Sequence, residues 1–450
     1  RSICDSIQSS ITFKMRLLDI ANVLGGAAIV VANPVAEKFQ RDEPATNNTV
    51  VEIVEKIVYE CPKISPKVFI ISMFSPEADV WYENAETKGS IGNLLAMNIT
   101  VPGLSMLFPD VHCLADESVC QLTTGESEIN AATSIQALML SAQFDLTQTY
   151  FMVAGIAGIN PMYGTLGSIA FSKYAVQVAL QYEFDARDIP DNYSTGYIPL
   201  GSYAPDQYPT SIYGTEVFEV NEALRDMAVG FASNATYNSS SAAVAYRANY
   251  ATDGRYAAAT TKPGVITCDV ATSDVYYSGT LLAEAFGNFT TLLTNGSGQY
   301  CMTAQEDNAT LEAMIRASIN GLVDFARIIV MRTGSDFDRP YHGESVEDNL
   351  FYADQGGFEP AIQNIYIAGT SVVQGILGGW EDTFKAGVKP TNYIGDIFGS
   401  IGGEPDFGPG SSYGGEEVDL SQVGISKRTA MGRSRRTMKG KRGLPGAKRS

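Results

Sequence analysis

The stretch YFMVAGIAGI, residues 150–159, combines an apolar run with closely spaced glycines. We expect Tyr150–Ala154 to form a short buried strand, because a run of this length and composition is typical of one. Gly155 and Gly158 follow, and glycine lets the backbone approach a ligand closely because it has no Cβ. The stretch therefore predicts a strand that runs into a glycine-rich, ligand-facing loop over Gly155–Gly167.

Two further predicted strands end in polar residues. Val68–Met73 is followed by Ser-Pro-Glu-Ala at residues 75–78, and Ala326–Met331 is followed by Arg-Thr-Gly-Ser-Asp at residues 332–336. Ligands of open α/β sheets bind at the carboxyl ends of the strands. Each motif alone also has an ordinary structural explanation, such as a helix cap or a turn.

The remaining pattern alternates strands with helices, which indicates an α/β fold with a mixed or largely parallel sheet. The further strands are predicted at Ser168–Val178 and Val265–Thr272, and the helices at Ile129–Ser141, Leu281–Leu293, Thr310–Asp324 and Ile362–Phe384. A segment rich in Tyr, Ser, Asn and Gly, Tyr193–Asp253, interrupts the pattern and is predicted to be an insertion or an elaborated loop region.

The charge of the chain is unevenly distributed. The formal net charge is −19, yet ten of the 31 basic residues lie between Lys427 and Arg449, where no acidic residue occurs. The strongly acidic remainder would repel nucleic acid and acidic membranes. We interpret residues 401–450 as a disordered linker and basic tail, rather than as a nucleic-acid-binding arm.

The N-terminal residues resemble an export signal. Met15 and Arg16 precede an apolar stretch from Leu17 to Val35, with small residues at Ala32 and Ala36. We therefore predict a leader and secretory signal over residues 1–36, an extension over 37–62 and a secreted or cell-surface mature protein without a membrane span. Glycosylation sequons support export and occur at Asn47, Asn98, Asn192, Asn234, Asn238, Asn288, Asn295 and Asn308.

The cysteines fit an oxidising compartment. Cys113 and Cys120 lie close together in a polar segment, which predicts a local disulfide. Cys268 and Cys301 are a further candidate pair that would leave Cys61 over, although sequence alone does not fix the connectivity. The chain contains two histidines, which argues against a histidine metal site or a histidine-based triad. We expect neither a metal nor a cofactor.

Six motifs in order resemble the nucleoside phosphorylase and methylthioadenosine nucleosidase superfamily. They are Met73–Ala78, Thr124–Ala132, Gly155–Ile159, Ala271–Asp274, Glu306–Thr310 and Arg332–Asp336. Over roughly residues 67–389 the chain looks most similar to the purine nucleoside permeases within it. The resemblance implies a three-layer α/β/α fold with a mixed, largely parallel sheet, in one catalytic domain over residues 63–400.

The resemblance also assigns roles to residues. Glu77 corresponds to the base that holds an attacking water, Asp336 to the acid that faces purine N7, and Arg332 to the residue that orients Glu77 and the water. The residues implied in substrate binding are Asn308 at the ribose, with Glu306 as its alternative, Gly155, Ala157 and Asp274, and Gly158 and Tyr276, which would frame the base.

Three functions remain open at this point. Phosphorylases of the superfamily bind phosphate through arginines, but the first loop offers Glu77, and Gly155–Ile159 offers neither arginine nor hydroxyl. We therefore expect water to be the nucleophile and the protein to be a purine nucleosidase. A phosphorylase and a nucleoside-binding or transport protein are the alternatives. The resemblance is compatible with a homo-oligomer but does not specify the number of subunits.

Overall fold

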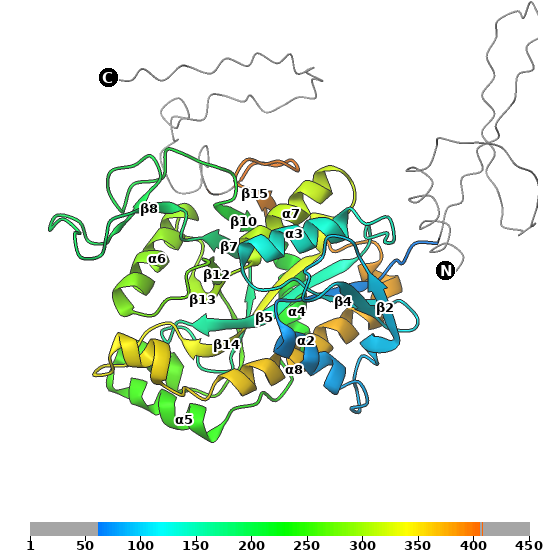
Figure 1. Cartoon of the computed structure of the whole chain (residues 1–450), viewed down its shortest axis with the longest axis horizontal. Helices are drawn as coiled ribbons and strands as arrows, with labels where there is room; N and C mark the ends of the chain where they lie inside the picture. The colour runs from blue at the N-terminus through cyan, green and yellow to red at the C-terminus, as the bar shows by residue number, and fades with distance from the viewer. Residues whose placement is uncertain (1–61, 406, 408–450) are drawn as a thin grey trace, which may run out of the picture. The chain divides into compact units, whose positions relative to one another are not determined.

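The structure is a computed structural model that describes residues 62–405 and 407 (Figure 1). The chain divides into two compact units. The described part of the first unit consists of residues 62–64 and Ala142–Asp145, in which Ile64 forms a single parallel bridge with Phe144. The second unit contains all the helices and strands named below. The predicted secretory signal, all but the last residue of the predicted extension, and the basic tail lie outside the described residues.

Four parallel strands form one half of the large sheet. In sheet order they are β4 (Val119–Thr123), β1 (Val68–Ser72), β5 (Tyr150–Ile159) and β14 (Ile328–Phe337). They are almost continuously apolar or buried, as expected of parallel strands covered on both faces. Two antiparallel strands, β3 (Asp110–Cys113) and β2 (Met97–Thr100), extend this half beyond β4.

The other half joins β5 through one antiparallel pair, Met302 with Ile159. Here β13 (Tyr300–Ala304), β12 (Asp269–Thr272) and β7 (Tyr174–Gln177) are parallel to one another. The antiparallel strands β10 (Val217–Glu219) and β15 (Gly395–Asp396) follow at the edge, whereas β6 (Ile169–Ser172) connects β14 to β11 (Val265–Thr267). The predicted mixed sheet is confirmed.

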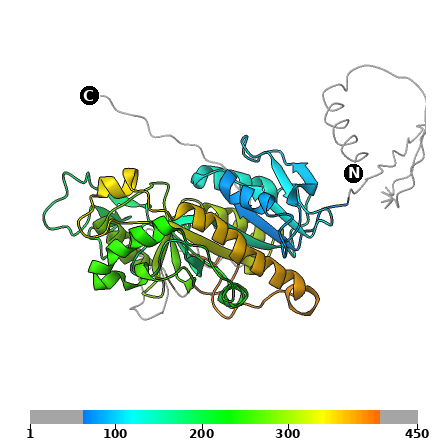
Figure 2. The same cartoon turned by 90° about the horizontal axis from the view of Figure 1, so that it is seen from below.

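Helices cover both faces of the sheet. On one face, α2 (Ser75–Glu83) and α4 (Glu222–Ala232) each pack against α8 (Phe358–Gly378), which is gold in Figure 2. On the other face, α3 (Ser127–Met139) packs against α7 (Asp307–Ile319). The helix α6 (Thr280–Leu293) covers β12 and β13, and the short α5 (Ser241–Arg247) follows α4.

The alternation of side chains along the strands explains the two helical layers. Alternate residues Val68 and Ile70 of β1, with Tyr150, Met152 and Ala154 of β5, share one apolar cluster with α2, α4 and α8. Successive side chains of a strand point to opposite faces, so the intervening residues face the layer formed by α3 and α7. The three-layer α/β/α arrangement follows from this alternation.

Several predicted boundaries differ from the observed ones. Gly155–Ile159 was expected to open a loop but continues β5, and Arg332–Asp336 continues β14, because the two strands pair along almost their whole length. The strand predicted at Ser168–Val178 is divided into β6 and β7, and that at Val265–Thr272 into β11 and β12.

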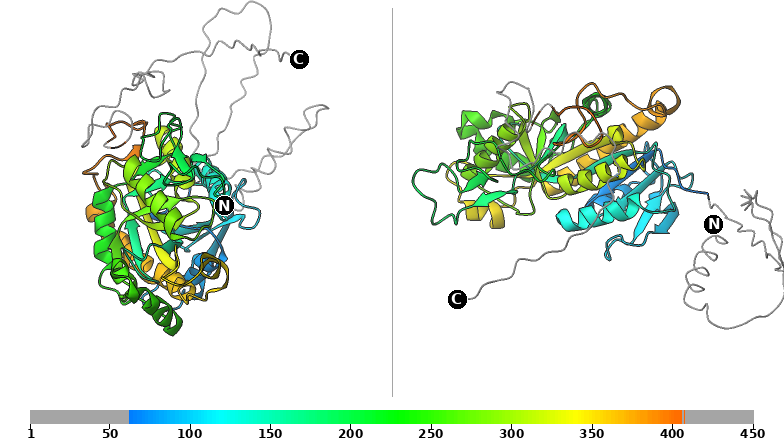
Figure 3. Two further views of the ribbon diagram at one scale, coloured as in Figure 1. Left: turned by 90° about the vertical axis from the view of Figure 1, so that its left-hand side faces the viewer. Right: turned by 90° about the horizontal axis from the view of Figure 1, so that it is seen from above.

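The segment Tyr193–Asp253 is only partly an insertion. It contributes β10 to the sheet and α4 to a helical layer, so the prediction of an insertion or elaborated loop region is wrong for these elements. Its first residues do belong to an elaborated region, in which β8 (Gln181–Glu183) pairs with β9 (Tyr197–Pro199). The loop between β8 and β9 projects from the second unit, as the right-hand view of Figure 3 shows.

Two disulfides lie within the described residues. Cys113–Cys120 joins β3 to β4, as predicted, and Cys268–Cys301 joins the β11–β12 junction to β13. The other two cysteines, Cys4 in the predicted leader and Cys61, lie outside the described residues. Among residues 62–405 and 407, none of the helices combines the length and apolar character needed to cross a membrane.

Candidate active site

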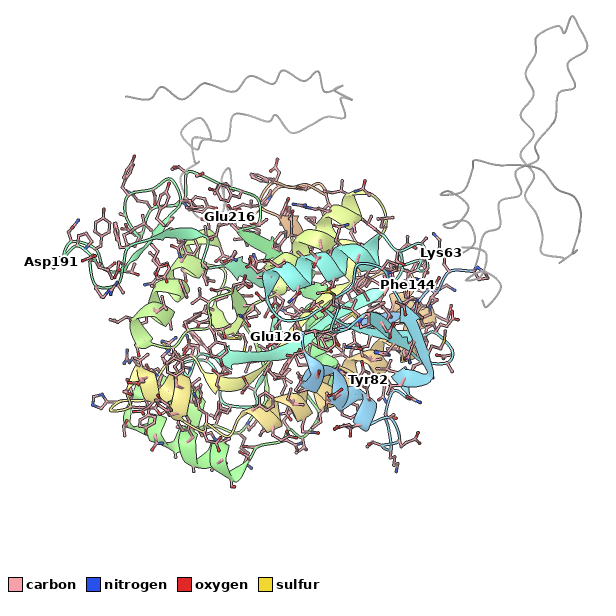
Figure 4. All side chains as sticks on the ribbon, in the orientation of Figure 1. Lys63, Tyr82, Glu126, Phe144, Asp191 and Glu216 are labelled. Atoms are coloured by element: carbon pink, nitrogen blue, oxygen red, sulfur yellow. A yellow bond between two sulfur atoms is a disulfide. The ribbon has the colours of Figure 1, made fainter. Side chains whose placement is uncertain are left out.

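A cavity of about 450 Å³ opens at the carboxyl ends of the central strands. Its walls come from the residues that follow β1, β4 and β12, from the ends of β5, β13 and β14, and from residues 349–358 before α8. Glu126, labelled in Figure 4, belongs to this wall at the start of α3. The cavity therefore lies where ligands of open α/β sheets bind.

The pairing of β5 with β14 brings the predicted site residues together. The register sets Arg332 beside Gly155 and, after an irregularity between Gly334 and Asp336, sets Asp336 beside Gly158. A Cβ on Gly155 would lie 2.6 Å from Nη1 of Arg332 and 2.7 Å from Oε1 of Glu77. Only glycine leaves room for both side chains at this point.

Glu77 lies in the first turn of α2 and is 1% exposed. Its Oε2 accepts a hydrogen bond from the backbone N–H of Met73, and its Oε1 accepts one from that of Ile156, both at 2.7 Å. Burial raises the pKa of Glu77 to about 8, although Arg332 and the two backbone donors oppose this shift. The carboxyl group is therefore mostly protonated at pH 7 and reaches the ionised form that a general base needs as the pH approaches 8.

Arg332 is the centre of a buried charge cluster. Its Nη2 pairs with Oε2 of Glu306 at 3.0 Å and with Oδ2 of Asp307 at 2.5 Å, and its Nη1 donates to the carbonyl of Ile156 at 3.2 Å. These bonds run to Glu306 and Asp307 rather than to Glu77, although Glu77 lies close by. The charge of Arg332 acts on Glu77 by lowering its pKa, and both side chains border the space beside Gly155. The orientation of Glu77 by Arg332 stays a prediction.

Asp336 lies on the cavity wall and accepts two hydrogen bonds. The hydroxyl of Tyr276 donates to Oδ2 at 3.1 Å, and that of Ser335 lies 2.6 Å from Oδ1. Burial raises the pKa of Asp336, while both hydroxyl groups oppose the shift. A carboxyl group in this environment favours the protonated form, in which it can donate to a ligand.

The other predicted site residues divide into two groups. Ala157, Gly158, Tyr276 and Glu306 line the cavity, and Gly155 supports it from behind by admitting Glu77 and Arg332. Glu306 also accepts a hydrogen bond from the N–H of Ser127 at 2.9 Å. Of the two ribose-binding candidates, Glu306 is therefore the one at the cavity.

Two predicted substrate-binding residues lie elsewhere. Asn308 is buried in α7, and its Nδ2 donates to the carbonyl of Thr215 at 2.8 Å, so it does not line the cavity. Asp274 accepts hydrogen bonds from the hydroxyl of Ser127 at 2.6 Å and from the N–H of Glu128 at 2.9 Å. It thus satisfies the N-terminus of α3, a structural role.

Several cavity residues carried no signal in the sequence. The side chain of Thr303 accepts the N–H of Gly158 at 2.9 Å, and Phe358 packs against Phe74 with ring centroids 6.3 Å apart. Residues 349–358 form a wall although they contain none of the six motifs. Their position depends on where α8 begins, which local sequence does not specify.

The cavity is strongly acidic. Six carboxyl groups line it: those of Glu77, Glu126, Glu306, Asp336, Asp338 and Asp354. Among the described residues that line the cavity, Arg332 is the one basic residue, and it is already paired. Over the described part of the chain, histidine, cysteine and acidic side chains do not form a cluster that could hold a metal ion.

Solved structures of nucleosidases are similar to this chain at low identity. The 5'-methylthioadenosine/S-adenosylhomocysteine nucleosidase from Streptococcus pneumoniae is 14% identical, with a TM-score of 0.41, and 69% of this chain and 99% of that chain are covered. The futalosine hydrolase from Helicobacter pylori is 12% identical, with a TM-score of 0.40, and 69% and 97% are covered.

Sequence relatives cover most of the chain. A purine nucleoside permease from Candida albicans is 49% identical over 350 residues, which are 76% of this chain and 83% of that protein. A probable purine nucleoside permease from Schizosaccharomyces pombe is 40% identical over 324 residues, which are 70% and 90%. The family model described as purine nucleoside permease matches residues 65–389. The chain therefore belongs to the purine nucleoside permease family.

Proposed function

We propose that this protein hydrolyses the N-glycosidic bond of purine nucleosides, releasing free base and ribose. The observation that supports this most is that Glu77 and Asp336, both with raised pKa values, line one cavity. They approach β5 at Gly155 and at Gly158, respectively. Glycosidases of one common class likewise use two carboxyl groups, one to activate a water molecule and one to protonate the leaving group.

In this reaction each carboxyl group acts on a different end of the nucleoside. Glu77 takes a proton from a water molecule as the water oxygen bonds to C1' of the sugar. The bond between C1' and purine N9 breaks, its electron pair stays on the base, and Asp336 gives its proton to N7. Glu306 lines the same cavity and can accept hydrogen bonds from the ribose hydroxyls.

The charge of the cavity favours water over phosphate as the nucleophile. The guanidinium of Arg332, which is the basic group on the described cavity wall, is already bound to Glu306 and Asp307, so its charge is not available to a phosphate dianion. Phosphate-binding sites require free forked donors or helix N-termini with unpaired N–H groups. At the N-terminus of α3, the N–H groups of Ser127 and Glu128 are taken by Glu306 and Asp274.

Base release in the absence of phosphate tests this proposal. Adenosine, inosine and guanosine are incubated with the protein in phosphate-free buffer, and the products are separated by chromatography. Free base and ribose are the expected products. Release of base only after phosphate is added, with ribose 1-phosphate as the second product, would instead identify a phosphorylase.

A nucleoside-binding protein that serves transport is the second candidate, and the names of the relatives support it. Such a protein would bind nucleosides in the same cavity and release them unchanged. Calorimetric binding without any base release, with and without phosphate, would identify this function.

We further propose that the protein is exported and glycosylated. The two disulfides support an oxidising compartment, because such bonds are rare in the cytosol. Most of the sequon asparagines within the described residues are exposed, which supports glycosylation. The exposed ones are Asn98, Asn192, Asn234, Asn238 and Asn288. Detection of the mature protein in culture medium or in the cell wall fraction tests the proposal, and exclusive recovery from the cytosol would contradict it.

A further inference from the structure

Tyr276 offers a hydroxyl group as well as an aromatic ring at the cavity. The side chain is 65% exposed at the cavity, as expected of a residue that stacks on a base, yet its hydroxyl group donates to Oδ2 of Asp336 at 3.1 Å. The same Oδ2 lies close to β5, because a Cβ built on Gly158 would be 3.5 Å from it. Gly158 itself lines the cavity. A residue needed only for stacking would not require a hydroxyl group.

The segment that carries Tyr276 is held on both sides. The carbonyl of Asp274 accepts a hydrogen bond from Nε2 of Gln305 at 3.0 Å, and the N–H of Gly279 donates to the carbonyl of Asp338 at 3.0 Å. Between them, the hydroxyl of Ser273 accepts the N–H of Val275 at 3.0 Å. These bonds join the segment to β13 and to the end of β14, which reduces the freedom of the tyrosine to leave Asp336.

The second oxygen of Asp336 has its own neighbour. The Ser335 hydroxyl lies 2.6 Å from Oδ1 and 3.0 Å from the carbonyl oxygen of Ala157, and its single proton can serve one of them at a time. When it is directed to Ala157, the Ser335 hydroxyl oxygen can accept a hydrogen bond from a protonated Asp336. When it is directed to Oδ1, it stabilises a carboxylate. Tyr276, in contrast, is placed to stabilise charge on Oδ2 in either arrangement.

We infer that Tyr276 is a positioning residue whose hydroxyl group holds Oδ2 of Asp336 and stabilises the carboxylate that forms when the acid gives its proton to the purine. The inference rests on the proposed hydrolysis for its chemical consequence. The negative charge left on Asp336 meets a donor that is already in place, so little reorganisation is needed as the proton leaves. The ring of Tyr276 remains available to contact the base.

Two substitutions separate the hydroxyl group from the ring. Tyr276→Phe keeps the ring and removes the donor, whereas Tyr276→Ala removes both. We expect Tyr276→Phe to lower kcat about tenfold or more with little change in KM, and Tyr276→Ala to raise KM as well. Tyr203→Phe is the matched control, because Tyr203 is 84% exposed and does not line the cavity.

A direct titration of Asp336 gives a readout that does not depend on turnover. The carboxyl ¹³C chemical shift of Asp336, identified by its loss in Asp336→Asn, is followed against pH. Loss of the hydroxyl donor in Tyr276→Phe should move the midpoint upward by about one pH unit, because a hydrogen bond to a carboxylate favours ionisation. Tyr203→Phe should leave the midpoint unchanged.

The outcomes distinguish this inference from the proposed function. An unchanged midpoint in Tyr276→Phe would overturn the inference, whatever the rate of base release. A shifted midpoint in a protein that releases no base would support the contact between Tyr276 and Asp336 and contradict the proposed hydrolysis. A shifted midpoint together with a lowered kcat would support both.

Discussion

Glu77 accepts a hydrogen bond of 2.7 Å from the backbone N–H of Ile156, although 79 residues separate the two in the chain. The bond ties the first turn of α2 to β5 at the point where Arg332 also contacts the strand. The neighbouring backbone donor, Met73, occupies the second carboxyl oxygen. Glu77 is therefore fixed in position by the sheet itself, before any ligand binds.

The stability of the protein should depend on the protonation of Glu77. Its pKa of about 8 in the folded state exceeds the ordinary 4.5, so between these values the folded protein binds more protons than the unfolded chain. The stabilisation is complete below about pH 4.5 and is lost as the pH rises through about 8. Relative to Glu77→Gln, the wild type should thus lose up to a few kcal/mol between pH 5 and pH 9.

Urea denaturation of the two proteins at several pH values measures this difference. The side-chain amide nitrogen introduced by Glu77→Gln cannot accept one of the two backbone hydrogen bonds, but that loss is the same at every pH. Parallel stability profiles for the wild type and the variant would show that Glu77 does not change its protonation between pH 5 and pH 9.

Asp336→Asn should impair hydrolysis selectively. An asparagine can donate a hydrogen bond to N7 but cannot transfer a proton, so good leaving groups should be affected less than ordinary purines. We expect a decrease of about 10²- to 10⁴-fold in kcat for inosine. The wild type should also act poorly on 7-deazainosine, which lacks N7. Equal rates of the variant and the wild type on inosine would exclude Asp336 as the acid.

Removal of Asp307 should destabilise the protein strongly. Its side chain is 0% exposed and pairs with Arg332, and breaking a buried ion pair from one side leaves an uncompensated charge. Asp307→Ala should cost about 3 kcal/mol of unfolding free energy, since Glu306 still pairs with Arg332. The control is Glu381→Ala, whose ion pair with Lys385 is exposed and should contribute about 0–1 kcal/mol. Similar losses in both variants would disprove a special role for the buried cluster.

Glycan occupancy should follow exposure. Asn234 and Asn288 are exposed, whereas Asn308 is 3% exposed and its amide is bonded to the carbonyl of Thr215. Enzymatic release of the glycans in ¹⁸O-water converts occupied asparagines to labelled aspartates, which peptide mass spectrometry detects. We expect the label at Asn234 and Asn288 but not at Asn308. A fully labelled Asn308 would mean that α7 begins differently in the secreted protein.

The sequence was sufficient to predict β1, the first half of β5 and the first half of β14, because short apolar runs bounded by polar residues identify buried parallel strands. It did not predict β4 and β13, although the end of β13 and the residues that follow β4 also contribute to the cavity. The motif at Arg332–Asp336 and the acid at Glu77 were found in the same way. The length of β5 and β14 was not predicted, since glycines usually end a strand. Here Gly155 and Gly158 remain in β5 because Arg332, Glu77 and Thr303 fill the space that a Cβ would take.

The residue that the resemblance gives as its first choice for a ribose contact does not line the cavity. Asn308 aligns with the expected position, but α7 begins at Asp307 and turns Asn308 toward Thr215, which leaves Glu306 at the cavity. The hydrogen bond between Tyr276 and Asp336 joins residues 60 positions apart. Such contacts depend on the packing of whole elements, and no local pattern in either segment indicates them.

The most direct test of the central claim compares nucleoside binding and base release in Glu77→Gln. If Glu77 activates the attacking water, the variant should bind inosine within a few-fold of the wild-type affinity in calorimetry and should lose at least about 10²-fold of the rate of hypoxanthine release in phosphate-free buffer. Base release at the wild-type rate, or loss of binding in a variant that remains folded, would contradict the account.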